Sequence, residues 1–240
     1  MDFSSGFVDK SHSLPIYKHR AQILESIAKN PLTIISGDTG CGKTTQVPKF
    51  IFQDKLNKNR MIAVTQPRRI SAMSVAERVA YELQGSVGAV VGFEVRFESC
   101  LTDSTVIKFM TEGVLMREYT HDNSLSKYSL LVIDEAHERG INCDFILGLV
   151  LGLLKTRKDL RVVVMSATLE TAKIVQYFQN GVKDITHKVI EVEGRYHPIE
   201  IMNTTSPVED YVEAAFNTVM QIHFEEPAGD ILVFLTGQAR

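Results

Sequence analysis

Residues 32–45, LTIISGDTGCGKTT, constrain the fold of this chain more than any other segment. Within them, residues 37–44 match the spacing G-x-x-x-x-G-K-[ST], with an apolar, strand-like run before the glycines and a helix-like run after them. This order of strand, loop and helix is the context that a phosphate-binding loop requires. A glycine-rich turn that binds nothing is the less favoured interpretation.

Each part of this loop has an expected role in binding phosphate. The glycines let the backbone fold tightly and bring its N–H groups against phosphate oxygens, and the start of the following helix adds its positive dipole end. Lys43 is expected to neutralise the outer phosphates, and the Thr44 hydroxyl is suited to bind Mg²⁺. The predicted nucleotide-binding residues of the loop are Gly37, Asp38, Thr39, Gly40, Cys41, Gly42, Lys43, Thr44 and Thr45.

The bulk properties exclude several classes of protein. A length of 240 residues with 44% hydrophobic and 23% charged residues fits an α/β protein with one large domain or slightly more. The net charge of -3 requires any nucleic-acid surface to be local. Three separate cysteines without a C-x-x-C pair argue against a zinc site or disulfide framework and for a reducing compartment. With no membrane span or signal peptide, we expect an intracellular protein, in the nucleus or the cytoplasm.

Apolar strand-like runs alternate with helical segments, which predicts an α/β fold with a parallel sheet flanked by helices on both sides. The expected strands are 32–36, 61–65, 107–111, 130–133 and 161–166, with 90–97 as a strand or hairpin arm and 98–105 as a turn. The expected helices are 17–28, one reaching from the phosphate loop to about 55, one ending near 83, then 112–120 and 145–154.

The predicted domain organisation has three parts. Residues 1–13 form a flexible N-terminus, 14–204 the first domain, and 205–240 the incomplete start of a second domain. Segments 189–192 and 199–202 are expected to be extended and to close the first domain. A helix at 207–224 and a buried strand at 231–235 are expected to begin the second.

The sequence LLVIDEAH supplies a second element for phosphate chemistry. The apolar run 130–133 is expected to carry Asp134 to the carboxyl edge of the sheet, where ligand sites of α/β proteins form. Asp134 would then orient a metal ion, and Glu135 would take a proton from the attacking water. Thr44, Asp134 and Glu135 are therefore the predicted metal site, with Asp134 and Glu135 catalytic. The alternative is that both carboxylates only cap a helix.

The segments GDTGCGKT, TQPRR, TEG, DEAH, SAT and FLTGQ follow one another along the chain. In this order they resemble motifs I, Ia, Ib, II, III and IV of the DEAH-box (DEAH/RHA) superfamily 2 RNA helicases, from residue 14 onward. Residues 220–238 also resemble the splicing-type members. The resemblance implies two RecA-like domains, ATP with Mg²⁺, and single-stranded RNA or RNA duplex ends as partners. An activating protein is a further partner that it suggests.

The resemblance also implies roles for individual residues. His137 is predicted to be catalytic, as are Asp134 and Glu135. Together with Ser166 and Thr168 of the SAT segment, it would couple the nucleotide state to domain movement. Arg78 would stack on the adenine base, since a planar guanidinium suits stacking. Without the resemblance, Arg68, Arg69 and Arg78 would be interpreted as a solvated face or as salt-bridge partners. The expected RNA contacts are Arg68, Arg69, Thr111 and Thr236.

Two departures from the family pattern bear on activity. Asp38 and Cys41 stand where the family more often has Glu and Ser, which is tolerable because the backbone binds the phosphates. The chain also ends before motifs V and VI, so we expect it to bind nucleotide better than it hydrolyses it. The first competing hypothesis, from another class, is a catalytically inert nucleotide- and RNA-binding module or a dominant-negative fragment. The second is a P-loop kinase or DNA translocase.

Overall fold

The computed structural model describes residues 10–167, 171–181, 186–194 and 198–236. The chain divides into two compact units, residues 1–196 and 197–240, which are described separately. Within the described residues, no helix is long and apolar enough to cross a membrane.

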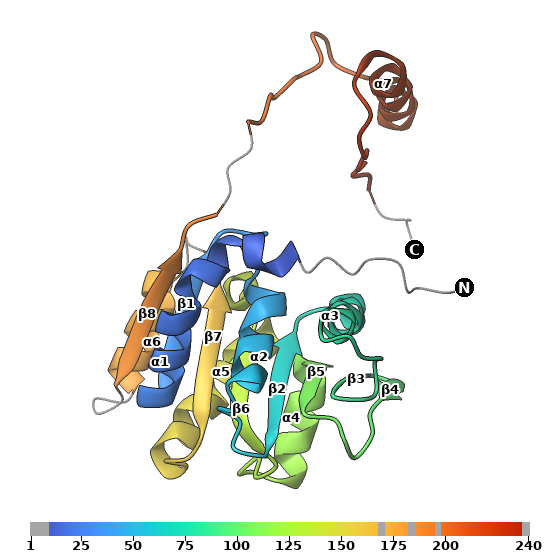
Figure 1. Ribbon diagram of the computed structural model, residues 1–240. Helices are drawn as coiled ribbons and strands as arrows, with labels where there is room; N and C mark the ends of the chain where they lie inside the picture. Colours follow the sequence, from blue (N-terminus) through green and yellow to red (C-terminus); the bar gives the residue numbers. More distant parts are fainter. Residues whose placement is uncertain (1–9, 168–170, 182–185, 195–197, 237–240) are drawn as a thin grey trace. The chain divides into compact units, whose positions relative to one another are not determined.

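A mostly parallel sheet forms the centre of the first unit (Figure 1). Within the described residues it has eight strands in the order β4-β3-β5-β2-β6-β7-β1-β8, and only the β3–β4 pair is antiparallel. The strands are β1 Leu32–Gly37, β2 Met61–Gln66, β3 Val91–Val95, β4 Glu98–Cys100, β5 Ile107–Thr111, β6 Tyr128–Ile133, β7 Arg161–Ser166 and β8 His187–Val192. The predicted α/β fold with a parallel sheet flanked by helices is confirmed.

Helices follow most of the strands. The α-helices of the first unit are α1 Arg20–Lys29, α2 Lys43–Gln53, α3 Arg69–Glu82, α4 Glu112–His121, α5 Ile141–Thr156 and α6 Thr171–Gly181. Short 3₁₀ helices are η1 Lys10–Ser13, η2 Pro15–His19 and η3 Ala136–Glu138. The expected helices 17–28, 112–120 and 145–154 correspond to η2 with α1, to α4 and to α5.

Two hydrophobic cores lie on the two faces of the sheet, because successive side chains of a strand point to opposite faces. In β6, Leu130 and Val132 belong to the core shared with α1, α2 and α3, whereas Leu131 and Ile133 belong to the core shared with α4, α5 and α6. All residues of β6 are buried. This burial on both faces explains why residues 130–133 of the strand form a continuous apolar run.

Two further segments of the first unit differ from the expectations. Residues Glu98–Cys100, expected in a turn, form β4 and pair antiparallel with β3. Residues Thr171–Gly181, for which no element was predicted, form α6. The extended segment at 189–192 belongs to β8, which pairs with β1 at the edge of the sheet.

The second unit contains α7, Tyr211–Glu225, close to the expected helix at 207–224. The Asp210 side chain caps this helix by accepting hydrogen bonds from the backbone N–H groups of Val212 and Glu213 at 2.8 and 3.1 Å. The strand expected at 231–235 is wrong for this chain: these residues have no strand assignment and their apolar side chains are exposed. An apolar run forms a strand only where another strand pairs with it.

Candidate nucleotide site

The phosphate loop and the DEAH segment meet at one edge of the sheet, where the carboxyl ends of β6, β7 and β1 lie side by side (Figure 1). These strand ends carry the DEAH segment, Ser166 and the phosphate loop. A cavity of about 320 Å³ lies at this edge. It is lined by Leu14, Thr39, Gly40, Gly42, Lys43, Thr44, Thr45, Arg78, Glu82 and Glu135.

The phosphate loop has the backbone that its glycines allow. Gly40 and Gly42 have φ values of 82° and 101°, in the left-handed region that side chains rarely adopt. Lys43, the first residue of α2, is buried, and its ammonium donates hydrogen bonds to the carbonyl oxygens of Gly37 and Asp38. The loop therefore holds its cation against its own backbone, at the start of a helix whose dipole favours an anion.

The two residues that depart from the family pattern are both accommodated. The Asp38 carboxylate accepts a hydrogen bond from the backbone N–H of Gly194 at 3.1 Å, which ties the loop to the segment after β8. A side chain at Gly194 would collide with Asp38, since its Cβ would lie 2.5 Å from the Asp38 Cβ. Cys41 is buried, with its Sγ 3.7 Å from the Lys43 ammonium.

Asp134 lies at the end of β6 with only 1% of its surface exposed. Its carboxylate accepts hydrogen bonds from Gln66 Nε2 at 2.6 Å, from the backbone N–H of Glu135 at 2.9 Å and from the Thr44 hydroxyl. Burial raises the pKa of the Asp134 carboxyl to about 6, against the lowering effect of the Thr44 and Gln66 hydrogen bonds. A cation beside this group would favour its ionised form.

The Thr44 hydroxyl and the Asp134 carboxylate fit a magnesium ion. Mg²⁺ binds proteins through one or two hard oxygen ligands, with substrate phosphates and water completing its shell. The Thr44 hydroxyl and the Asp134 carboxylate contact each other beside the phosphate loop, where such an ion would have to bind. A cluster of three or more His, Cys, Asp or Glu side chains suited to a metal is not found among the described residues.

Glu135 and His137 connect the DEAH segment to the end of β7. Glu135 lines the cavity and has a φ of 54°, a left-handed conformation that costs a residue with a side chain about 1–2 kcal/mol. The backbone N–H of Ala167 donates a hydrogen bond to His137 Nδ1 at 3.1 Å. This N–H is always a donor, so Nδ1 is the acceptor and the imidazole carries its proton on Nε2. Glu135 Oε2 lies 3.5 Å from the same Nδ1.

Arg78 also lines the cavity, from α3. Its guanidinium Nε donates to Glu82 Oε1 at 2.7 Å, while 60% of the side chain stays exposed. Arg78 and the phosphate loop thus line the same cavity, and the stacking of Arg78 on a base stays a prediction.

The residues predicted to contact RNA are only partly brought together. Arg68 and Arg69 lie at the start of α3 and pair with Glu138 at 3.4 Å and Glu98 at 3.9 Å. Thr111 ends β5, in register with Gln66 at the end of the neighbouring β2. Thr236 belongs to the second unit, where its hydroxyl hydrogen-bonds the Tyr211 hydroxyl at 2.7 Å. Thr168 lies outside the described residues, whereas Ser166 is buried at the end of β7.

Sequence reasoning missed three residues of this edge. Gln66 fixes Asp134, yet its side chain gave no signal beyond its place in TQPRR. Glu82 is four residues after Arg78, a spacing at which opposite charges meet on a helix, so it could have been found. Phe97 is 88% exposed with a φ of 69°, and the Arg96 guanidinium lies 4.7 Å from its ring centroid. The exposure of an aromatic residue after a strand cannot be read from sequence.

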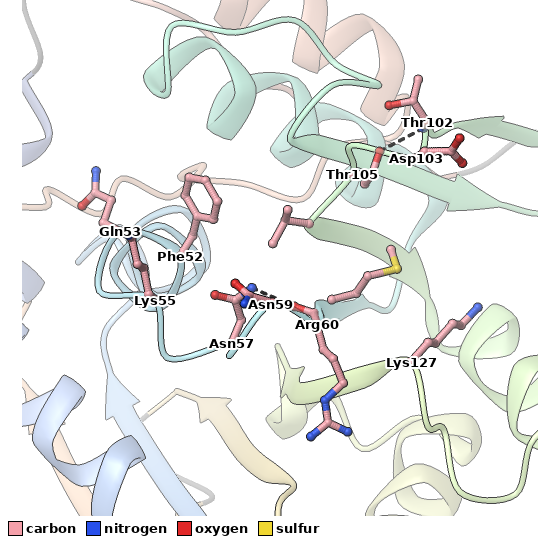
Figure 2. A pocket seen from close by; sticks show the side chains of 12 residues that line it. Phe52, Gln53, Lys55, Asn57, Asn59, Arg60, Thr102, Asp103, Thr105 and Lys127 are labelled. Atoms are coloured by element: carbon pink, nitrogen blue, oxygen red, sulfur yellow. Dashed lines mark hydrogen bonds between the residues drawn. The ribbon is translucent and has the colours of Figure 1, made fainter.

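A second cavity, of about 870 Å³, lies at the opposite edge of the sheet, where β2, β5 and β6 begin. Figure 2 shows Arg60 and Lys127 among the residues around it. Arg60 donates to Asp159 and to the Ser126 carbonyl, and Lys127 pairs with Glu118, so both cations already serve the fold. No residue of the phosphate loop or the DEAH segment is among those that line this cavity.

Comparison with known protein families agrees with this geometry. A family model described as DEAD/DEAH box helicase matches residues 17–176, which contain the phosphate loop, the DEAH segment and Ser166. The match covers more than half of the chain and includes every strand from β1 to β7. Family membership implies an ATP-dependent helicase that binds nucleic acid. The chain belongs to the DEAD/DEAH box helicase family.

Proposed function

We propose that this chain is the nucleotide-binding part of a DEAH-box ATP-dependent RNA helicase of the splicing-type subgroup. The observation that carries the proposal is the convergence of Lys43, the Thr44–Asp134 pair and the His137–Ala167 hydrogen bond at one edge of the sheet. The sequence DEAH at 134–137 favours this branch of the family, and residues 220–238 favour the splicing-type subgroup.

The proposed roles in ATP hydrolysis follow from position. Lys43 would exchange its two carbonyl partners for oxygens of the outer phosphates, which form stronger, charge-assisted hydrogen bonds. Thr44 and Asp134 would hold Mg²⁺, which when bound neutralises charge on the phosphates. Glu135 is the proposed general base, because its carboxylate lines the cavity and is only partly exposed.

The proposed coupling path begins at the same residues. A nucleotide that moves Glu135 also acts on His137 two residues later, and through it on the backbone of Ala167. The Thr171 hydroxyl donates to Ser36 Oγ at 2.8 Å, which links the start of α6 to β1 just before the phosphate loop. Ser166 and Thr168 remain the proposed coupling residues, with residues 205–240 as the start of the second RecA-like domain that would move.

The proposed RNA contacts lie on the β2–β5 side of the same edge. Arg68 and Arg69 are exposed, and the α3 N-terminus favours a phosphate. Thr111 is a further proposed contact of the first unit, and Thr236 is a separate proposed contact in the second unit. Phe97 joins them, since Glu98, which pairs with Arg69, follows it directly, and an exposed aromatic ring offers a stacking surface for a base.

The test is ATP binding and RNA-stimulated ATP hydrolysis by the whole chain, beside Lys43→Ala. A fluorescent ATP analogue should bind the unaltered chain at least tenfold more tightly than the variant, and single-stranded RNA should stimulate hydrolysis only in the former. Equal affinities would refute the proposal. Binding without hydrolysis would instead identify a nucleotide- and RNA-binding module. Competition between RNA and DNA strands separates an RNA helicase from a DNA translocase.

A further inference from the structure

In the cavity at the phosphate loop, an exposed cationic side chain is hydrogen-bonded to a buried carboxylate. Arg78 has 60% of its side chain exposed, whereas only 4% of the Glu82 side chain is exposed. The Arg78 Nε donates to Glu82 Oε1 at 2.7 Å, which engages the inner edge of the guanidinium. The position of the exposed part of Arg78 therefore depends on where Glu82 is held.

Glu82 is held by the helix that follows the phosphate loop. Its second oxygen, Oε2, accepts hydrogen bonds from Lys49 Nζ at 2.7 Å and from Gln46 Nε2 at 2.8 Å. Lys49 and Gln46 both belong to α2, which starts at Lys43. One carboxylate thus connects α3, which carries Arg78, to the helix that carries the phosphate-binding lysine.

The amide of Gln46 shows that this arrangement serves the carboxylate. Gln46 is completely buried, and its Oε1 has no hydrogen-bond partner among the described residues. Turning the amide over would place this oxygen against Glu82 Oε2, so two acceptors would face each other. The amide orientation that bonds the carboxylate is kept although it leaves a buried oxygen unsatisfied.

Stability alone does not account for the buried pair of Lys49 and Glu82. The two side chains are 3% and 4% exposed, and a buried ion pair is often no more stabilising than an apolar pair of similar size. Burial would raise the pKa of the Glu82 carboxyl, but the hydrogen bonds from Lys49, Gln46 and Arg78 keep it below its ordinary value. The carboxylate is ionised at neutral pH and available to Arg78.

We propose that Glu82, fixed by Lys49 and Gln46, is a positioning residue that orients the Arg78 guanidinium for stacking on the base of a nucleoside triphosphate bound in the phosphate loop. This inference rests on the proposed function and on the stacking role that the family resemblance implies for Arg78. Glu82 acts on the base through Arg78, so its effect depends on a ligand that has a base. A ligand made only of phosphates reaches the loop without it.

The experiment measures dissociation constants of the 240-residue chain for ATP and for inorganic tripolyphosphate by calorimetry. Four forms are compared: unaltered, Arg78→Ala, Glu82→Gln and the double variant. Glu82→Gln should weaken ATP about fivefold, the effect of losing one stacking contact, and leave tripolyphosphate within twofold. In the Arg78→Ala background the same change should alter ATP affinity less than twofold. Glu77→Gln, on the exposed face of α3, is the matched control and should change neither constant.

Two results would overturn the inference. Equal weakening of both ligands by Glu82→Gln would make Glu82 a structural residue only, as would equal weakening of ATP with and without Arg78. Because Glu82→Gln leaves the Lys49 charge buried without its partner, Lys49→Met with Glu82→Leu serves as the second variant. It should melt near the unaltered temperature and show the same selective loss for ATP.

The controls separate this inference from the proposed function. If Lys43→Ala binds ATP as tightly as the unaltered chain, the proposed function fails and the inference fails with it. If Lys43→Ala loses ATP binding while Glu82→Gln leaves the ratio of the two dissociation constants unchanged, only the inference fails.

Discussion

Two glycines of the phosphate loop should differ in what an alanine costs. At either position the side chain enters a left-handed conformation, with φ of 82° at Gly40 and 101° at Gly42, for about 1–2 kcal/mol. A Cβ at Gly40 meets no described atom within 4 Å. At Gly42 it would lie 2.9 Å from Leu14 Cδ1 and 3.0 Å from Ile16 Cγ2. Ile16 is completely buried, so overpacking adds about 1–3 kcal/mol.

We therefore expect Gly40→Ala to lower the free energy of unfolding by about 1–2 kcal/mol and Gly42→Ala by about 2–5 kcal/mol. The assay is urea unfolding followed by far-UV circular dichroism, since the chain has no tryptophan. Nucleotide is omitted so that ligand binding does not contribute to stability. Shortening Leu14 to alanine should cost less in the Gly42→Ala background than in the unaltered chain. A loss at Gly40 equal to or larger than that at Gly42 would refute this reasoning.

Three further predictions concern the first unit. Lys108→Met should lower the free energy of unfolding by about 3–5 kcal/mol, because buried Lys108 bonds both Glu94 and Glu118; a urea-measured loss below about 1 kcal/mol would contradict this. Burial raises the pKa of Glu118, but its hydrogen bonds lower it below 4.5 overall, so its stabilisation is complete above that pH and lost in more acid solution. Between pH 6 and pH 3, the melting temperature of Lys108→Met should therefore decrease less steeply than that of the unaltered chain. Burial raises the pKa of Cys143 to about 12. A disulfide reagent at pH 8 should therefore modify Cys100 in the folded chain and Cys143 only after unfolding. Equal modification rates of the two thiols in the folded chain would contradict this.

The strands that position the site could be predicted because their burial leaves a local trace. β6 and β7 are buried on both faces, so each contains a continuous apolar run that is followed by polar residues of the site. The phosphate loop could also be predicted, because its own turn requires the left-handed backbone that Gly40 and Gly42 adopt. In each case the cause of the structure lies within a few residues.

The contacts that complete the site could not be predicted, because their partners are distant in sequence. Glu82 is 33 residues from Lys49, and the local sequence around neither residue indicates that the two side chains pair. A separation of 30 residues likewise makes the hydrogen bond between His137 and Ala167 unpredictable from sequence. The strand predicted at 231–235 is wrong because the local apolar pattern indicates a strand, whereas a strand also needs a pairing partner. Such a partner is absent from the described residues.

The polar groups at the carboxyl edge satisfy one another across strands rather than within them. Gln66 at the end of β2 bonds Asp134 at the end of β6, and Ala167, after β7, bonds His137. A buried polar group that loses its partner costs about 1–3 kcal/mol, so a ligand can displace one of these bonds only by replacing it. Phosphate oxygens can replace the carbonyl partners of Lys43, whereas they cannot donate to the Asp134 carboxylate. A bound cation can replace the hydrogen-bond donors of the Asp134 carboxylate. Anion binding by the loop and cation binding by Asp134 should therefore favour each other.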